Sequence, residues 1–138
     1  MSVKGISFHV LKRMADHRGV LCAGEVNDGL PFAPKRIFYV YGVPTRKSRG
    51  EHAHKGCHQF LICLNGSVSV VLDDGEERAE FELNDPSVGL WIEPGVWAVQ
   101  HDHHKHTVLL VLASDLYDAN DYIRDYDEFL EWKKKIPN

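Results

Sequence analysis

Short apolar or alternating runs, separated by turn residues, extend from Val3 to about Ala113. Alternation is typical of strands with one buried face, and many short strands at regular spacing are typical of a sandwich or barrel. The clearest predicted strands are residues 35–43, 59–64, 68–72, 88–92 and 107–112. The pattern therefore predicts an all-β fold.

Two turn signals separate the central runs. Asn65-Gly66 lies between two apolar runs, and Asp73-Asp74-Gly75 follows the second of them. These residue types tolerate positive φ and favour hairpins. We expect the strands on either side of each turn to be antiparallel neighbours.

After Ser114 the pattern changes to a helical period. Ile123, Tyr126 and Leu130 recur on one face of a predicted helix within residues 122–135, with acidic residues before it and lysines at its end. We expect one short C-terminal helix on the outside of the barrel. Because no repeat or linker interrupts the chain, residues 1–138 are predicted to form a single domain.

Composition limits the possible partners. The chain has 138 residues and a formal net charge of −4, so it offers no basic surface for a nucleic acid or an anionic membrane. No apolar run approaches the roughly 20 residues that span a bilayer. A small-molecule ligand is the remaining expectation.

The cysteines indicate a reducing compartment. Cys22, Cys57 and Cys63 are odd in number and lack CxxC spacing, and residues 1–14 lack the apolar core of a signal peptide. We therefore expect a cytoplasmic protein with reduced thiols.

A histidine pair stands out in the segment that follows Arg49. His52 and His54 are two residues apart, so in a strand they project from the same face and can reach one ligand. An isolated pair of this kind is often only a half-exposed part of a strand. The flanking cations Arg49 and Lys55 favour a functional site instead.

The histidine pair resembles the first cupin motif, in which two histidines and a glutamate bind a metal. Here the glutamate position is Gln59, and a second cupin-like block, residues 89–98, ends at Ala98 where a histidine is customary. Two ligands remain, fewer than the three of an open catalytic zinc site. We expect no metal and no other cofactor. Imidazoles with an ordinary pKa near 6.5 are suited to moving protons at neutral pH.

A denser histidine cluster precedes the last predicted strand. It consists of His101, His103, His104 and His106. Because these residues lie in a polar connection, we interpret them as a solvated loop rather than as a metal site.

Cations and aromatic residues supply further candidates. The candidate phosphate partners are Arg36, Arg46, Arg49 and Lys55, since arginine can bind phosphate in a fork. The aromatic residues that could be core or could stack on a sugar or base are Phe38, Tyr39, Trp91 and Trp97.

Four blocks together resemble the sugar 3,4-ketoisomerases that act on thymidine-diphosphate (dTDP)-4-keto-6-deoxyglucose. The blocks are RGEHAHK (49–55), HQFLICLNGSV (58–68), LNDPSVGLWIEPGVW (83–97) and VLLVLASDLYDANDYIRDYDEF (108–129). The resemblance runs from about Phe8 to Phe129. It implies a cupin double-stranded β-helix (jelly-roll) barrel and a homodimer with an exchanged N-terminal strand. It also implies catalysis without metal, in the biosynthesis of 3-amino-3,6-dideoxyhexoses for surface glycans.

The resemblance also implies residue roles. His52 stands at the position of the proposed base, and His54 handles protons or positions the substrate beside it. The reaction removes the C3 proton, passes through an enediol and reprotonates C4. Substrate-binding positions carried over or inferred are Arg18, Arg36, Arg49, Lys55, Gln59, Trp97, Phe38 and Ala98.

Two positions depart from the family pattern. Phe38 stands where tyrosine is common, and Ala98 where histidine or another polar residue is common. Arg18 is similar to the galacto-forming members, so we expect the galacto rather than the gluco product. Two other hypotheses stay open: a metal-dependent cupin such as a dioxygenase or sugar isomerase, and a non-catalytic nucleotide-sugar-binding protein.

Overall fold

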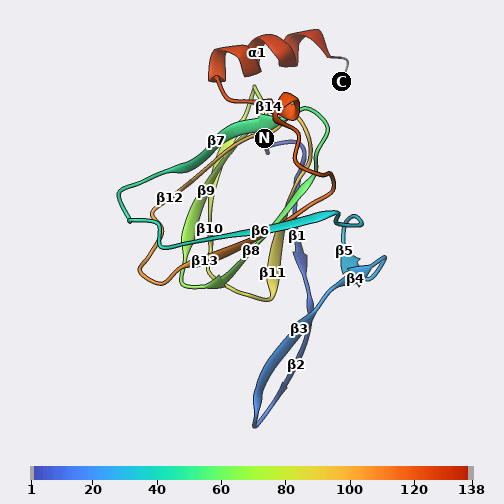
Figure 1. The fold of residues 1–138 in the computed structure, drawn as a ribbon, viewed down its shortest axis with the longest axis vertical. Coiled ribbons are helices and arrows are strands. Elements are labelled where there is room, and N and C mark those ends of the chain that lie inside the picture. The colour runs from blue at the N-terminus through green and yellow to red at the C-terminus, as the bar shows by residue number, and fades with distance from the viewer. Residues whose placement is uncertain (1, 137–138) are drawn as a thin grey trace.

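The structure is a computed structural model that describes residues 2–136. Two five-stranded sheets face each other (Figure 1), and all of their strand pairs are antiparallel. The first sheet, in spatial order, is β1 (Ile6–Val10), β11 (Val88–Ile92), β8 (Gln59–Asn65), β13 (Val108–Ala113) and β6 (Arg36–Tyr41). The second is β10 (Arg78–Leu83), β9 (Val68–Asp73), β12 (Trp97–His101), β7 (Arg49–His54) and β14 (Tyr122–Ile123). This arrangement confirms the predicted all-β barrel fold.

Alternation along the strands fills the space between the sheets. Leu61 and Cys63 of β8 share one buried cluster with Val70 and Leu72 of β9. Burying an aliphatic side chain of this size contributes roughly 1.5–3 kcal/mol relative to leaving it exposed. The apolar residues at every second position therefore hold the two sheets together.

One turn prediction is confirmed and the other is wrong. Asp73-Asp74-Gly75 leads from β9 into its antiparallel neighbour β10, as expected. The turn at Asn65-Gly66 instead carries the chain from β8 in one sheet to β9 in the other. The side chain of Asn65 donates to the carbonyl of His106, and the Ser67 N–H donates to Thr107 Oγ1, so contacts with another loop determine its direction.

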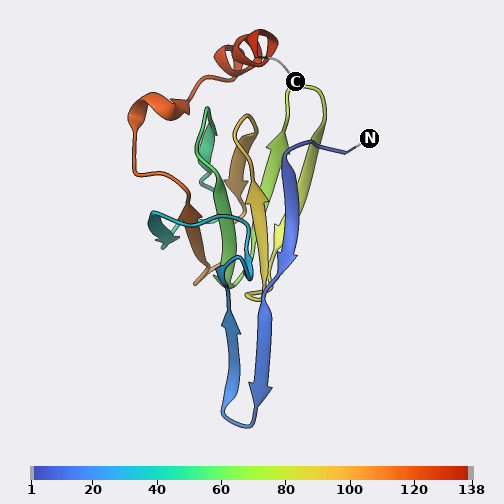
Figure 2. The same cartoon turned by 90° about the vertical axis from the view of Figure 1, so that its right-hand side faces the viewer.

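A hairpin projects from the barrel. It consists of β2 (Lys12–Asp16) and β3 (Gly19–Ala23), and it extends away from both sheets in two perpendicular views (Figures 1 and 2). A short parallel pair, β4 (Glu25–Val26) and β5 (Gly29–Leu30), leads back toward the barrel.

The C-terminal segment differs from its prediction at its start. After a 3₁₀ turn at Ala119–Asp121, Tyr122 and Ile123 form β14, and the helix α1 is Tyr126–Lys135. The placement of Ile123 in the helix was wrong because the extended Asp125 caps the helix, accepting a hydrogen bond from the Glu128 N–H.

The helix α1 packs on the outside of the barrel, at the end opposite the projecting hairpin (Figure 2). Its buried residue Phe129 packs in a cluster with Ala53, Trp97 and Ile123. No helix within residues 2–136 is long and apolar enough to cross a membrane.

Candidate active site

A bulge in β7 positions His52. Ala98 of β12 is paired with His52, but the next residue, Val99, is paired with Gly50, so Glu51 is an extra residue in β7. Gly50 and Glu51 both have positive φ, at 82° and 56°. A Cβ on Gly50 would also lie 3.0 Å from the carbonyl oxygen of Ala98. Bulges commonly re-aim side chains beside functional sites.

The backbone of this bulge sets the protonation of His52. Its Nδ1 lies 3.0 Å from the carbonyl oxygen of Gly50, and because a carbonyl only accepts, Nδ1 carries the proton and Nε2 keeps its lone pair. Burial, and then the neighbouring charge of His54, lower the pKa of His52 to about 4. His52 is therefore a neutral base near neutral pH.

His54 has a carboxylate partner. Its Nδ1 lies 2.8 Å from Oδ2 of Asp121. Burial raises the pKa of Asp121, but hydrogen bonds from His54 and the Gly56 N–H outweigh burial, so the net shift is downward. Burial is the largest cause that lowers the pKa of His54. Its Nε2 is buried and has no hydrogen-bond partner.

Tyr122 packs against both imidazoles. It is paired with His54 across β14 and β7, so the two side chains share one face. The ring centroid of Tyr122 lies 4.4 Å from that of His54 and 5.0 Å from that of His52, and the two imidazoles are 4.9 Å apart. Three rings therefore form one cluster at this end of the barrel.

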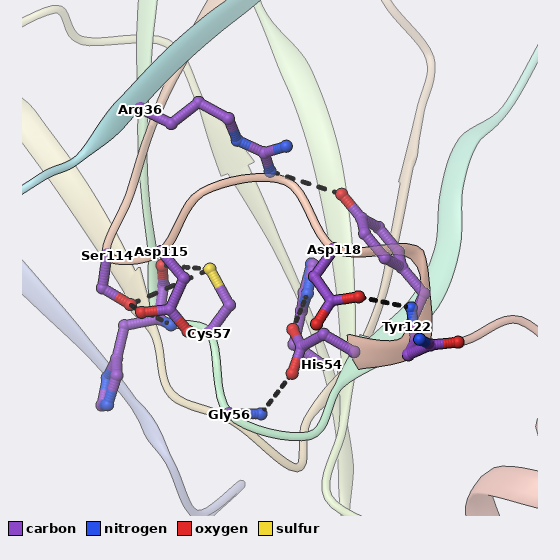
Figure 3. A network of polar contacts seen from close by, with 11 residues as sticks. Arg36, His54, Gly56, Cys57, Ser114, Asp115, Asp118 and Tyr122 are labelled. Atoms are coloured by element: carbon purple, nitrogen blue, oxygen red, sulfur yellow. Dashed lines mark hydrogen bonds and ion pairs between the residues drawn. The ribbon is translucent and has the colours of Figure 1, made fainter.

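Arg36 reaches the cluster from the opposite sheet. It donates from Nη2 to the phenol oxygen of Tyr122 at 3.3 Å (Figure 3). Its guanidinium lies 5.0 Å from the ring centre of Phe38 and 5.4 Å from that of Tyr117. The Nε of Arg36 is buried and has no partner. The site thus presents an unpartnered donor on Arg36 and an unpartnered acceptor on His54.

Other predicted binding residues face the same interior. Gln59 alternates in phase with Leu61 and Cys63, which line the core, and it is buried. Ala98 lies across from His52 and belongs to the same core cluster, against which Phe38 packs. The structure therefore brings these three predicted residues to the interior that the histidines face.

Trp97 is not brought to the histidine pair. It is the neighbour of Ala98 in β12 and points to the opposite face, where its ring packs on Tyr126 and Phe129 of α1. In this structure Trp97 anchors the helix.

The remaining predicted cations are exposed. Lys55 follows β7 and its backbone N–H donates to the carbonyl of Asp121. Arg49 begins β7, and Arg18 lies at the tip of the projecting hairpin, where it pairs with Asp16 at 2.7 Å. Arg18 is therefore far from the histidines of its own chain.

The later histidines do not join the pair, and one of them corrects the prediction of a solvated loop. His103 is 2 % exposed, with both ring nitrogens buried and unpartnered. Positive φ at Asp102 turns the chain, and Thr45 Oγ1 donates to the carbonyl of His103. Burial and then the charge of Arg49 lower the pKa of His103. Of the four histidines in this cluster, His104 and His106 are exposed.

One group of metal-ligand types lies close together within residues 2–136. Ligand atoms of His54, Cys57 and Asp121 lie within 4.8 Å of one another. His54 and Asp121 are already bonded to each other, and the Cys57 thiol donates to the carbonyl of His58 at 3.3 Å. A metal would have to replace these contacts, so the group fits a proton-transfer pair better.

Asp121 and Tyr122 were not identified as functional from the sequence. Asp121 was interpreted as part of an acidic lead into the helix, and Tyr122 as part of the helix itself. No local pattern marks them, because their partner His54 lies 67 residues earlier than Asp121.

The chain is similar to known proteins over almost its whole length. Residues 4–134 match the family described as FdtA, WxcM-like, C-terminal. A TDP-4-oxo-6-deoxy-alpha-D-glucose-3,4-oxoisomerase from Aneurinibacillus thermoaerophilus is 46% identical over 136 residues, covering 99% of this chain and 96% of that protein.

Solved structures agree with the sequence comparison. A histidine-to-asparagine mutant of the 3,4-ketoisomerase QdtA from Thermoanaerobacterium thermosaccharolyticum, in complex with TDP-4-keto-6-deoxyglucose, is 44% identical with a TM-score of 0.94, over 97% of both chains. The WlaRB TDP-quinovose 3,4-ketoisomerase from Campylobacter jejuni is 41% identical with a TM-score of 0.89, over 94% of this chain and 99% of that chain.

Proposed function

We propose that this chain, which belongs to the FdtA family of sugar 3,4-ketoisomerases, converts TDP-4-keto-6-deoxyglucose into a TDP-3-keto-6-deoxyhexose. The observation that carries the proposal is the pair of imidazoles formed by the half-buried His52 and the buried His54. Each is held through Nδ1, so each leaves its Nε2 free as a base. An isomerisation that moves a proton between adjacent carbons needs such bases and no redox group.

The proposed reaction begins at C3. Nε2 of His52 takes the C3 proton, the C3–H electrons form the C3–C4 double bond, and the C4 carbonyl electrons move to its oxygen. The unpartnered Nε–H of Arg36 is suited to stabilise this negative charge. The proton held by His52 can exchange with solvent before His52 protonates C4. The O3 proton passes through Nε2 of His54 to O4, which leaves a ketone at C3 and a hydroxyl at C4.

The other predicted contacts remain proposals for substrate binding. Gln59, Phe38 and Ala98 face the interior that would receive the sugar. Arg49 and Lys55 lie at the two ends of β7 and are exposed cations suited to phosphate. We do not include Trp97 among the proposed substrate contacts, because its ring packs under α1.

We infer a homodimer that exchanges its N-terminal strand segment. The edge strand β1 and the β2–β3 hairpin present an open edge and exposed apolar side chains, among them Met14, Val20 and Leu21. A lone two-stranded hairpin is marginally stable in water, and edge strands readily pair with another chain. A second copy of the chain would cover both the open edge of β1 and the exposed apolar side chains of the hairpin.

The dimer also gives Arg18 a role. Because Arg18 lies at the hairpin tip, away from the histidines of its own chain, it would act at the site of a second copy. This arginine is the residue on which we base the expected galacto product.

The free cysteines Cys22, Cys57 and Cys63 support a reducing, cytoplasmic setting.

The test is turnover of TDP-4-keto-6-deoxyglucose in deuterated buffer, with protein purified without an affinity tag and treated with a chelator. We expect a 3-keto product that carries solvent deuterium at C4, and its C4 configuration reports galacto or gluco. Absence of both product and exchange would reject the proposal. Activity lost on chelation and restored by iron, zinc or manganese would favour the metal-dependent cupin, and TDP binding without turnover would favour a binding protein.

A further inference from the structure

We propose that Asp121 is a positioning residue, which holds the imidazole of His54 with its proton on Nδ1 and with the lone pair of Nε2 available to the sugar. The inference rests on the proposed ketoisomerase function and deepens it. The net reaction requires two proton movements: from C3 to C4, and from the O3 hydroxyl to the O4 oxygen. His52 serves the first, and His54 with Asp121 serves the second.

The carboxylate of Asp121 is fixed on both oxygens. Oδ2 accepts from Nδ1 of His54 at 2.8 Å, and Oδ1 accepts from the Gly56 N–H at 2.7 Å. Its backbone is held as well, because its carbonyl accepts from the Lys55 N–H at 2.9 Å and its N–H donates to the Asp118 carbonyl at 3.0 Å. The side chain therefore has one orientation, in which it faces the imidazole.

This orientation fixes the tautomer of His54. A carboxylate can only accept, so the neutral imidazole carries its proton on Nδ1 and presents the lone pair of Nε2. That nitrogen is buried without a partner, in a side chain that is 7 % exposed. An unpaired buried acceptor costs free energy, and a sugar hydroxyl would satisfy it.

Asp121 also makes a protonated His54 possible. The charged or titratable groups that act on His54 or lie close to it are Asp121, Arg36, Arg124, His52, Tyr122 and Cys57. Asp121 is the carboxylate among them, and the two guanidiniums oppose a positive imidazole. Without Asp121, a proton taken from O3 would create a buried cation facing two others.

His52 has no equivalent carboxylate partner, because its Nδ1 partner is the neutral carbonyl of Gly50.

The proton transfers of the proposed reaction then follow in three steps. His52 takes the C3 proton and O4 becomes an enediolate oxygen. His54 takes the O3 proton and gives it to O4. His52 returns its proton to C4 as the C3 ketone forms.

The test compares Asp121→Asn with Asp118→Asn. In Asp121→Asn, the amide oxygen must face the Gly56 N–H to keep that hydrogen bond, so the amide NH₂ faces His54. Because the NH₂ group donates, Nδ1 of His54 must accept, and the imidazole proton moves to Nε2. Asp118 is a matched control in the same segment, because its carboxylate caps the 3₁₀ turn by accepting from the Asn120 N–H, whereas that of Asp121 accepts from His54.

For Asp121→Asn, we expect product formation to fall about 100-fold while solvent exchange of the substrate C3 proton, which His52 performs, falls less than about 3-fold. Asp118→Asn should keep both rates near those of the wild type. An equal loss of exchange and conversion in Asp121→Asn, or the same loss in Asp118→Asn, would overturn the inference. Lack of wild-type turnover would instead reject the proposed function.

A second measurement does not depend on a variant or on activity. Nitrogen-15 NMR of the ligand-free wild type should show His54 protonated on Nδ1 and unprotonated on Nε2 near neutral pH. Protonation on Nε2 alone would overturn the inference even if the variants fail to fold.

Discussion

Ala98 lies directly across from His52, in register on the antiparallel strands β12 and β7. Its methyl group is buried in the interior cluster. A larger side chain at this position would project beside the imidazole and into the space proposed for the sugar.

Ala98→Leu tests this relationship. We expect the KM for the sugar nucleotide to rise about 10-fold or more, alongside an overpacking cost of about 1–3 kcal/mol. The matched control is Ala79→Leu on β10, which also packs at the core but away from the pair. Steady-state kinetics and thermal unfolding separate the two effects, and equal KM changes in both variants would contradict the placement.

The lowered pKa of His52 predicts a pH dependence of stability. The unfolded chain binds a proton with a pKa near 6.5 and the folded chain with a pKa of about 4. Between these values the unfolded state binds more protons, so stability is lost as the pH falls from 6.5 to 4. His52→Asn should reduce the loss of unfolding free energy between pH 7 and pH 5 by about 1–2 kcal/mol.

Urea unfolding at the two pH values measures this difference. The same variant should keep a native circular dichroism spectrum and lose turnover by about 100-fold or more. An unchanged pH dependence would show that His52 titrates normally, and retained turnover would remove it as the base.

The hydrogen bond between Arg36 and Tyr122 predicts a smaller kinetic effect. Tyr122→Phe keeps the ring against both histidines but removes the oxygen that accepts from Arg36. We expect kcat to fall about 10-fold, the equivalent of one hydrogen bond to a charged group. Affinity for TDP, measured by calorimetry, should stay the same. Tyr117→Phe, which removes a hydroxyl from a second tyrosine near Arg36 but keeps its ring, should leave kcat unchanged.

The exposed hairpin predicts the effect of a charge on assembly. Met14 and Leu21 are paired across β2 and β3 and are both exposed. Leu21→Glu should shift the proposed dimer toward monomer, as measured by analytical ultracentrifugation. Leu64→Glu, at an exposed leucine outside the hairpin, is the control. A wild-type monomer would contradict the predicted dimer.

The sequence predicted the barrel well because its evidence was local. Alternation located strands such as β11 within a residue, and the histidine spacing placed His52 and His54 on one face. The hairpin predicted at Asn65-Gly66 was wrong, because residues that tolerate positive φ fit a turn that crosses between sheets as well as a hairpin turn.

The missing parts of the site depend on contacts between distant segments. The bulge at Gly50 and Glu51 has no sequence signal that separates it from a regular strand. Asp121 reaches His54 only because β14 pairs with the edge of β7. The start of the helix could have been predicted, since Asp125 and Glu128 have the spacing of a capping pattern. The apolar period that includes Ile123 favoured an earlier start instead.

The two-residue strand β14 constrains how this family member can change. Tyr122 faces the histidines and Ile123 faces the helix cluster, and shifting a strand by one residue exchanges its faces. A slip of β14 by one residue against β7 would therefore put an aliphatic side chain into the polar site and a phenol under α1. The pairing register of two residues thus joins the chemistry of the site to the anchoring of the helix.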